Sequence, residues 1–159
     1  MEKRRSFILI STLALVLGGC SGDREQTAQS EPSEAPAAVT MSRSTPAPGA
    51  SVFFITPTNG ATTSSPVEIK FGISGMAVIP AGEFVENSGH HHLLVDTELM
   101  NMDQPVPKDD NNLHFGKGQT ETVLALEPGQ HTLQLVLGDG NHIPHDPPLL
   151  SDRITITVE

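Results

Sequence analysis

Short stretches of alternating apolar and polar residues recur along the C-terminal part of the chain. In the clearest of them, Val67, Ile69, Phe71 and Ile73 are separated by polar or small residues, and residues 154–158 repeat the pattern. Successive side chains of a strand point to opposite faces, so this alternation predicts half-buried strands. No long stretch carries the spacing of an amphipathic helix. The pattern therefore predicts an all-β domain.

Seven short strands are predicted, separated by turns rich in Gly and Pro. They span residues 52–55, 66–74, 90–96, 113–115, 120–126, 131–138 and 154–158. Strands of this length and spacing fit two packed antiparallel sheets. We therefore expect residues 51–159 to form an antiparallel β-sandwich of the immunoglobulin or fibronectin-type-III kind.

One turn indicates which strand of an immunoglobulin-like domain each predicted strand corresponds to. Pro128-Gly129-x-His131 resembles the corner between strands E and F of immunoglobulin-like domains, where a tyrosine usually stands in place of His131. The chain has no tyrosine. We therefore expect Pro128, Gly129 and His131 to be structural, with the imidazole bonded to the backbone. On this assignment, residues 113–115 form a short strand D.

The N-terminus has the features of an export signal. Lys3, Arg4 and Arg5 precede an apolar stretch, residues 6–17, which is shorter than the about 20 residues of a membrane-spanning helix. A basic start followed by a short apolar segment and small residues is typical of a secretory signal peptide. We assign it to residues 1–19.

The end of this signal resembles the lipobox of bacterial lipoproteins. Leu17-Gly18-Gly19 is followed at once by Cys20, the only cysteine of the chain. The resemblance implies cleavage before Cys20 and a lipid on its sulfur, which would anchor the chain in a membrane. Because Ser21, rather than Asp, follows, lipoprotein sorting rules imply the outer membrane, with the domain facing the periplasm.

Residues 20–50 separate this anchor from the domain. The segment is rich in Ser, Ala, Pro, Glu, Gln and Thr and contains almost no large apolar residue. Such a composition cannot bury enough surface to offset the entropy of ordering. We therefore expect a disordered tether.

The charge of the chain excludes some partners. Its formal net charge is −10, and from Ser51 onward fourteen acidic residues face four basic ones. Such a surface repels nucleic acid and attracts cations. With Cys20 lipidated, no thiol remains for disulfides or catalysis. We find no serine nucleophile motif and no paired carboxylates, so we expect a binding module rather than an enzyme.

All seven histidines follow residue 89. His90 and His92 are two apart in a predicted strand and should share a face, while His91 points the other way. In a sandwich of this kind the B–C, D–E and F–G loops gather at one end. Histidines from three segments should meet there: His90, His92, His114, His142 and His145.

Imidazole is a good ligand for copper and zinc. We therefore expect these five histidines to bind a transition-metal ion, with Asp96 and Asp146 accepting hydrogen bonds that orient the rings. Three histidines and one open metal position would also suffice to activate water, which keeps a metal-dependent hydrolase open as an alternative. A further alternative is a structural or interaction domain of the cell envelope that binds no metal and uses its histidines to brace loops.

Four blocks of sequence resemble one bacterial family. The stretches 89–96, 114–121, 128–135 and 141–145 are similar to those of domain-of-unknown-function family 4399, and the resemblance extends over residues 51–159. It implies a small exported domain. It brings no established activity, so no catalytic residue is carried over.

Overall fold

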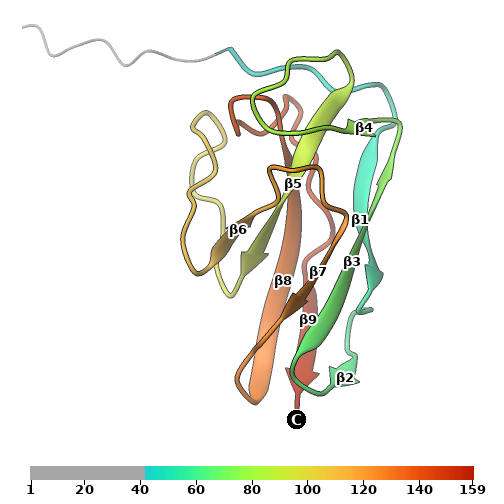
Figure 1. Ribbon diagram of the computed structural model, residues 1–159, viewed down its shortest axis with the longest axis vertical. Coiled ribbons are helices and arrows are strands. Elements are labelled where there is room, and N and C mark those ends of the chain that lie inside the picture. Colours follow the sequence, from blue (N-terminus) through green and yellow to red (C-terminus); the bar gives the residue numbers. More distant parts are fainter. Residues whose placement is uncertain (1–41) are drawn as a thin grey trace, which may run out of the picture. The chain divides into compact units, whose positions relative to one another are not determined.

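The computed structural model describes residues 42–159, which form a two-layer β-sandwich (Figure 1). The all-β, immunoglobulin-like expectation is confirmed. One layer is a three-stranded antiparallel sheet in the order β1-β3-β7. Its strands are β1 (Ser51–Thr56), β3 (Val67–Ser74) and β7 (Glu121–Leu124).

The second layer is a six-stranded sheet. Its order is β2-β9-β8-β5-β4, and β6 pairs with β5 beside this path. The long pairings β5–β8 and β8–β9 are antiparallel, whereas β2 and β4 add two-residue parallel pairings at the sides. The strands are β2 (Thr62–Thr63), β4 (Ala77–Val78), β5 (Ser88–Val95), β6 (Asn112–His114), β8 (Gly129–Gly138) and β9 (Ile154–Val158).

All seven predicted strands are present, but one lies in the other sheet. The segment expected as strand D pairs as β6 with β5, through His92↔His114 and Leu93↔Leu113, and not with β7. The two-residue strands β2 and β4 were not predicted, because so short a stretch carries no alternation. The placement of β6 matters for function, since it brings His114 beside β5.

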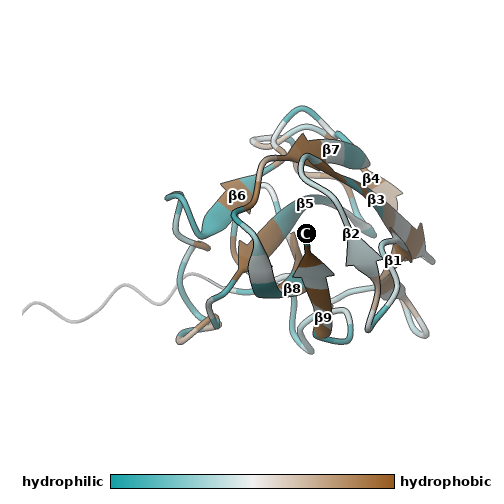
Figure 2. Ribbon diagram, turned by 90° about the horizontal axis from the view of Figure 1, so that it is seen from below, coloured by the Kyte–Doolittle hydropathy of each residue, from teal (hydrophilic) through white to brown (hydrophobic). Residues whose placement is uncertain are grey.

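The main core lies between the two sheets. Ile69 from β3, Leu93 from β5, Leu135 from β8 and Ile156 from β9 are fully buried there. Seen along the strands, the two layers curve around this apolar interior (Figure 2). Burial of such side chains contributes about 1.5–3 kcal/mol each, so the domain holds together without disulfides.

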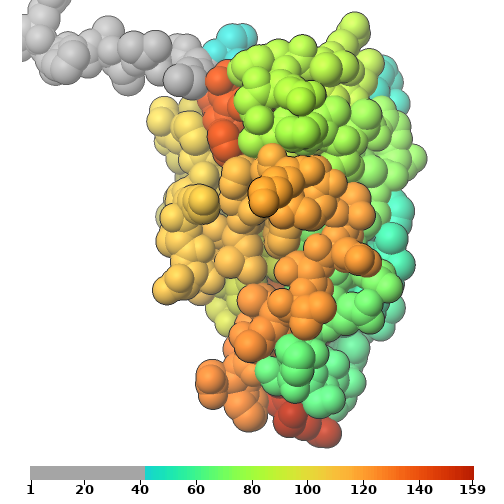
Figure 3. Space-filling view, viewed as in Figure 1, coloured from blue at the N-terminus to red at the C-terminus, as the bar shows by residue number. Residues whose placement is uncertain are grey.

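The outer face of the six-stranded sheet is covered as well. Leu94 and Val136 point out of the sandwich and pack with Val106, which belongs to the long connection between β5 and β6. In Figure 3 this connection, coloured yellow, stands against one side of the molecule. As a result, all eight residues of β5 are buried, and polar side chains on its outer face are shielded from water.

Residues 43–50 pack against the domain, so its boundary lies before the expected Ser51. The guanidinium of Arg43 donates to the carbonyl oxygen of Pro144 at 2.9 Å and to that of His145. The amide of Asp146 donates to the carbonyl of Ser44 at 2.9 Å. This N-terminal strap ties the domain's start to the connection between β8 and β9.

The signal peptide 1–19, Cys20 and most of the expected tether lie outside the described residues. Within residues 42–159, the structure contains no helix with the length and apolar character needed to cross a membrane.

His131 lies at the start of β8, next to the corner that precedes this strand. Its Nε2 lies 2.8 Å from the carbonyl oxygen of Glu127, and its Nδ1 lies 2.7 Å from a carboxylate oxygen of Asp96. Both partners can only accept, so the protonated imidazole, in which both ring nitrogens donate, is the form that satisfies them both. The hydrogen bond with Asp96 is the main reason that the pKa of His131 is raised above 6.5, and the Glu127 carbonyl adds to it.

This corner predicts a pH dependence of stability. Because the folded state holds the His131 proton more tightly than the unfolded chain, the stabilisation is fully present below pH 6.5. It is lost as the pH rises through the raised pKa. His131→Phe should therefore cost roughly 0.2–1 kcal/mol at low pH and less at high pH, as measured by urea unfolding. Asp96→Asn should flatten the same profile, and a wild-type–variant difference that is constant with pH would contradict the assignment.

Candidate metal centre

Strand β5 presents two histidines on its outer face. His90 and His92 point away from the sandwich core, while His91 points inward, as their alternation requires. His90 lies opposite Gly138 of β8, and His92 lies opposite Val136. The side chains of His90 and His92 are 0% and 1% exposed, and their Nε2 atoms are 3.1 Å apart.

Strand β6 supplies the third histidine. His114 is the direct cross-strand neighbour of His92, and it is half-buried. Its ring centre lies 5.1 Å from that of His92 and 5.0 Å from that of His90. The pairing of β6 with β5, rather than with the other sheet, creates this contact.

The connection between β8 and β9 supplies the fourth. His142 stands in a tight turn, where its amide donates to the carbonyl of Asp139 at 2.9 Å. Its φ is +68°, a left-handed conformation that costs a non-glycine residue about 1–2 kcal/mol. The ring centre of His142 is 4.9 Å from that of His90 and 4.7 Å from that of His114.

Four imidazoles therefore form one cluster, which we call the histidine cluster: His90, His92, His114 and His142. One ring nitrogen from each of His90, His114 and His142 lies within 4.8 Å of the others, so these three can hold a metal ion. Nε2 of His92 lies 3.1 Å from Nε2 of His90, so His92 belongs to the same group of ring nitrogens. No carboxylate takes part in this group, which sets it apart from a mixed oxygen–nitrogen site.

Two glycines leave room for the rings. A β-carbon at Gly138 would lie 3.0 Å from Nε2 of His92 and 3.3 Å from the carbonyl carbon of His142. A β-carbon at Gly116 would overlap the ring of His114. A side chain at either position would crowd these rings, so glycine leaves room for their close approach.

The surroundings of His90 and His92 keep these two imidazoles neutral. Burial is the main cause that lowers the pKa of His90 to about 4 and that of His92 to about 2, and repulsion among the neighbouring histidines adds to it. Burial also lowers the pKa of His114, followed by the influence of His142. Neutral imidazole is the form that binds metal ions, because the lone pair of one ring nitrogen is then free.

Several ring nitrogens of the cluster have no partner. Nδ1 of His90, Nδ1 of His92 and Nε2 of His114 are buried without a hydrogen bond. A buried unpaired polar group costs about 1–3 kcal/mol. His131, by contrast, has a partner for each ring nitrogen, so the cluster is not held together by hydrogen bonds of the kind that brace the corner.

His145, expected as a fifth ligand, is directed elsewhere. Its Nδ1 lies 2.8 Å from the hydroxyl of Ser44 in the N-terminal strap. It is fully buried, and burial is the main cause that lowers its pKa. His145 thus stands beside the cluster without joining the group of convergent ring nitrogens.

The two expected orienting carboxylates also lie elsewhere. Asp96 is bonded to His131 and to the amide of Thr132, at 2.7 Å in both cases. Asp146 is an exposed residue whose carboxylate pairs with Arg43 at 3.8 Å. Asp96 and Asp146 were expected to orient the histidine rings because they are close to His92 and His145 in the sequence. In the structure both carboxylates bind other partners.

Asp139 is the residue that sequence reasoning missed. It is buried, and its Oδ1 accepts hydrogen bonds from the amides of Asn141 at 2.8 Å and Ile143 at 3.1 Å. These bonds fix the turn that presents His142. The signal was available, because Asp followed by Gly-Asn is typical of turns in which the carboxylate caps nearby amides. Nothing in the sequence signalled the contacts of Arg43 and Ser44.

The sequence model of one protein family, described as "Domain of unknown function (DUF4399)", matches residues 69–159. The chain belongs to this family. The DUF4399 match begins within β3 and includes all seven histidines, so the whole histidine cluster lies inside it. No curated protein and no solved structure matches the chain significantly. The earlier resemblance to this family is confirmed.

Proposed function

We propose that this DUF4399 protein is an exported, lipid-anchored module that binds one transition-metal ion, copper or zinc, through His90, His92, His114 and His142. The observation that carries the proposal is the convergence of these four imidazoles from β5, β6 and the β8–β9 connection on one face. Apolar side chains buried at these four positions would cost the fold less free energy than imidazoles with unpaired nitrogens, so stability alone does not explain the histidines.

The distances support a site that needs only a small closure. A metal–nitrogen bond of about 2.0–2.1 Å places two ligand nitrogens about 3.3 Å apart in a tetrahedron and about 2.9 Å apart at right angles. The 3.1 Å between Nε2 of His90 and Nε2 of His92 lies between these values. The half-buried His114 and His142 would close the remaining distance, since β5 holds the other two rings fixed.

The donor set favours copper or zinc over harder ions. Magnesium and calcium prefer oxygen ligands, while imidazole suits zinc, copper and nickel. The acidic surface, with a formal net charge of −10 for the chain, would raise the local concentration of any cation. Sequestration or delivery of the ion suits a site in which all four rings serve as ligands.

The envelope location rests on the N-terminal sequence. The basic start, the short apolar segment and Cys20 support export and lipid anchoring. Anchoring at the outer membrane, with the domain facing the periplasm, would place the histidine cluster where metal ions enter the cell envelope. A structural envelope domain without metal is the outcome if the cluster binds nothing.

Metal binding can be tested on the lipidated protein, extracted in detergent from the membrane fraction where the lipid on Cys20 should hold it. Titration with Zn(II) or Cu(II) is expected to give one ion per chain, and X-ray absorption should show a coordination shell of imidazole nitrogens. No binding at micromolar metal, or a shell dominated by oxygen ligands, would contradict the proposal.

A further inference from the structure

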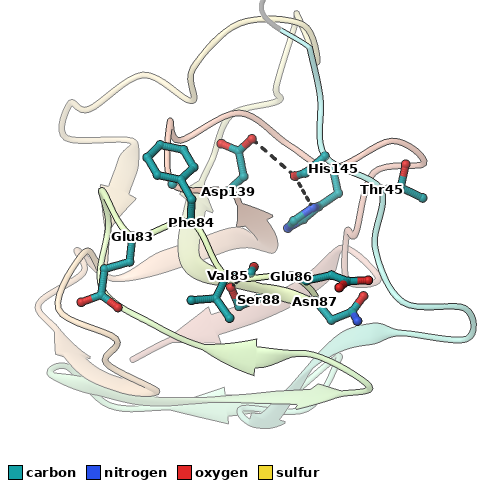
Figure 4. A pocket seen from close by; sticks show the side chains of 11 residues that line it. Thr45, Glu83, Phe84, Val85, Glu86, Asn87, Ser88, Asp139 and His145 are labelled. Atoms are coloured by element: carbon teal, nitrogen blue, oxygen red, sulfur yellow. Dashed lines mark hydrogen bonds between the residues drawn. The ribbon is translucent and has the colours of Figure 1, made fainter.

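A pocket of about 330 Å³ opens at one end of the domain, outside the histidine cluster (Figure 4). Three segments line it: residues 83–88, which end at the first residue of β5, Asp139 and Gly140 after β8, and Ser44 with Thr45 of the N-terminal strap. In Figure 3 the segments that carry these residues meet at the upper end of the molecule. The volume is in the range of small-molecule sites.

One buried nitrogen in this pocket has no partner. His145 is 2% exposed, and its Nε2 is buried without a hydrogen bond. Figure 4 shows the imidazole directed into the pocket, opposite the 83–88 segment. A β-carbon at Gly89 would come within 3.1 Å of this Nε2, so the absence of a side chain there leaves room beside the nitrogen.

The hydrogen bonds around His145 favour one form of its ring. The hydroxyl of Ser44 lies 3.4 Å from a carboxylate oxygen of Asp139 and 2.8 Å from Nδ1 of His145. The charge of the carboxylate, which can only accept, favours a Ser44 hydroxyl that points to Asp139. In that arrangement Nδ1 of His145 donates to Ser44, and Nε2 carries a lone pair that can accept a hydrogen bond from a ligand.

The segment opposite His145 carries both acidic and apolar side chains. Glu83 and Glu86 are exposed on the wall, and neither forms an ion pair with a residue in 42–159. No lysine or arginine lines the pocket. Phe84 and Val85, which are 69% and 57% exposed, provide an apolar wall.

We propose that this pocket binds a primary ammonium group carried on an apolar stem. The ammonium would donate one N–H to Nε2 of His145, and Glu83 and Glu86 would balance its charge. The stem would pack on Phe84 and Val85, where an aromatic face also favours a nearby cation. A second metal ion is a poorer fit, because among the described residues the group of ligand atoms close enough for an ion is the one formed by His90, His114 and His142.

The test uses hexylamine, which is protonated at neutral pH as a lysine side chain is. Binding to the purified full-length chain, followed by ¹H–¹⁵N NMR, is expected to shift resonances of residues 83–88 and 139–140. The Nε2 of His145 should move from the ¹⁵N shift of an unprotonated nitrogen toward that of a hydrogen-bonded one. Hexanol and tetramethylammonium, which lack the charge and the N–H respectively, should bind at least tenfold more weakly.

Variants separate the contributions of the pocket. Replacing both Glu83→Gln and Glu86→Gln removes two exposed charges and should weaken hexylamine about tenfold, while Glu68→Gln on the other sheet should change nothing. His145→Phe keeps the ring but removes the acceptor and should also weaken binding. Two results would overturn the proposal. One is that tetramethylammonium or hexanol binds as tightly as hexylamine. The other is that Zn(II) displaces hexylamine from a His114→Gln, His142→Gln variant.

That double variant should bind hexylamine as the wild type does, so this site and the metal centre can fail independently.

Discussion

Saturating Zn(II) or Cu(II) should raise the free energy of unfolding of the wild-type domain by about 4 kcal/mol when free metal is about 1,000 times its Kd. The same metal should leave the His114→Gln, His142→Gln double variant unchanged. The physical reason is linkage, because the four rings converge only in the folded state. For a domain of this size, the expected increase in Tm is roughly 10–20 °C.

His114 and His142 are the best positions for this test. Both are half-buried, so glutamine is expected to disturb the metal-free fold less than a change at the fully buried His90 or His92. The matched control is His145→Gln, a histidine of the same connection that lies outside the cluster. Its metal-induced increase should match that of the wild type. A comparable increase in the double variant, measured by calorimetry, would show that the ion binds elsewhere.

His91→Leu should stabilise the protein by about 1–3 kcal/mol. His91 points into the main core, where its ring centre lies 5.2 Å from that of Phe71. It is 0% exposed, and both of its ring nitrogens are buried without a partner. Burial lowers its pKa to about 4, so the ring is neutral at pH 7. Its unpaired N–H and lone pair then destabilise the folded state. Leucine has a similar volume and no polar atom.

The measurement is urea unfolding at pH 7 without metal. His91→Gln serves as the matched control, because it keeps buried polar atoms and should give no gain. Since His91 faces away from the histidine cluster, the leucine variant should also retain metal binding. A leucine variant that unfolds at lower urea than the wild type would mean that the imidazole makes a favourable contact in the core.

The strands were predictable from the sequence because their signal is local. Alternation in β3 and β9 follows from one buried face, and a period of two reveals such a strand regardless of its partners. The Pro128-Gly129 turn located β8, and the corner role of His131 followed from its position after that turn. By contrast, β2 and β4 extend over two residues each, which is too short for a pattern.

For the site, the sequence determined which histidines share a face. The two-residue spacing of His90 and His92 put their rings on one side of β5, and His91 on the other, before any partner strand was known. The choice of sheet for β6 was not predictable, because pairing depends on which edge is open in the assembled sandwich. That choice brings His114 to His92.

Tertiary structure also decided which residues of the β8–β9 connection take part. His142 and His145 are three apart and chemically equal in the sequence. Asp139 fixes the turn that aims His142 at the cluster, while Ser44, distant in the chain, holds His145 away from it. The sequence thus determined an all-β domain rich in histidine. Only the folded structure decided which four histidines converge, because long-range hydrogen bonds set the direction of a ring in a loop.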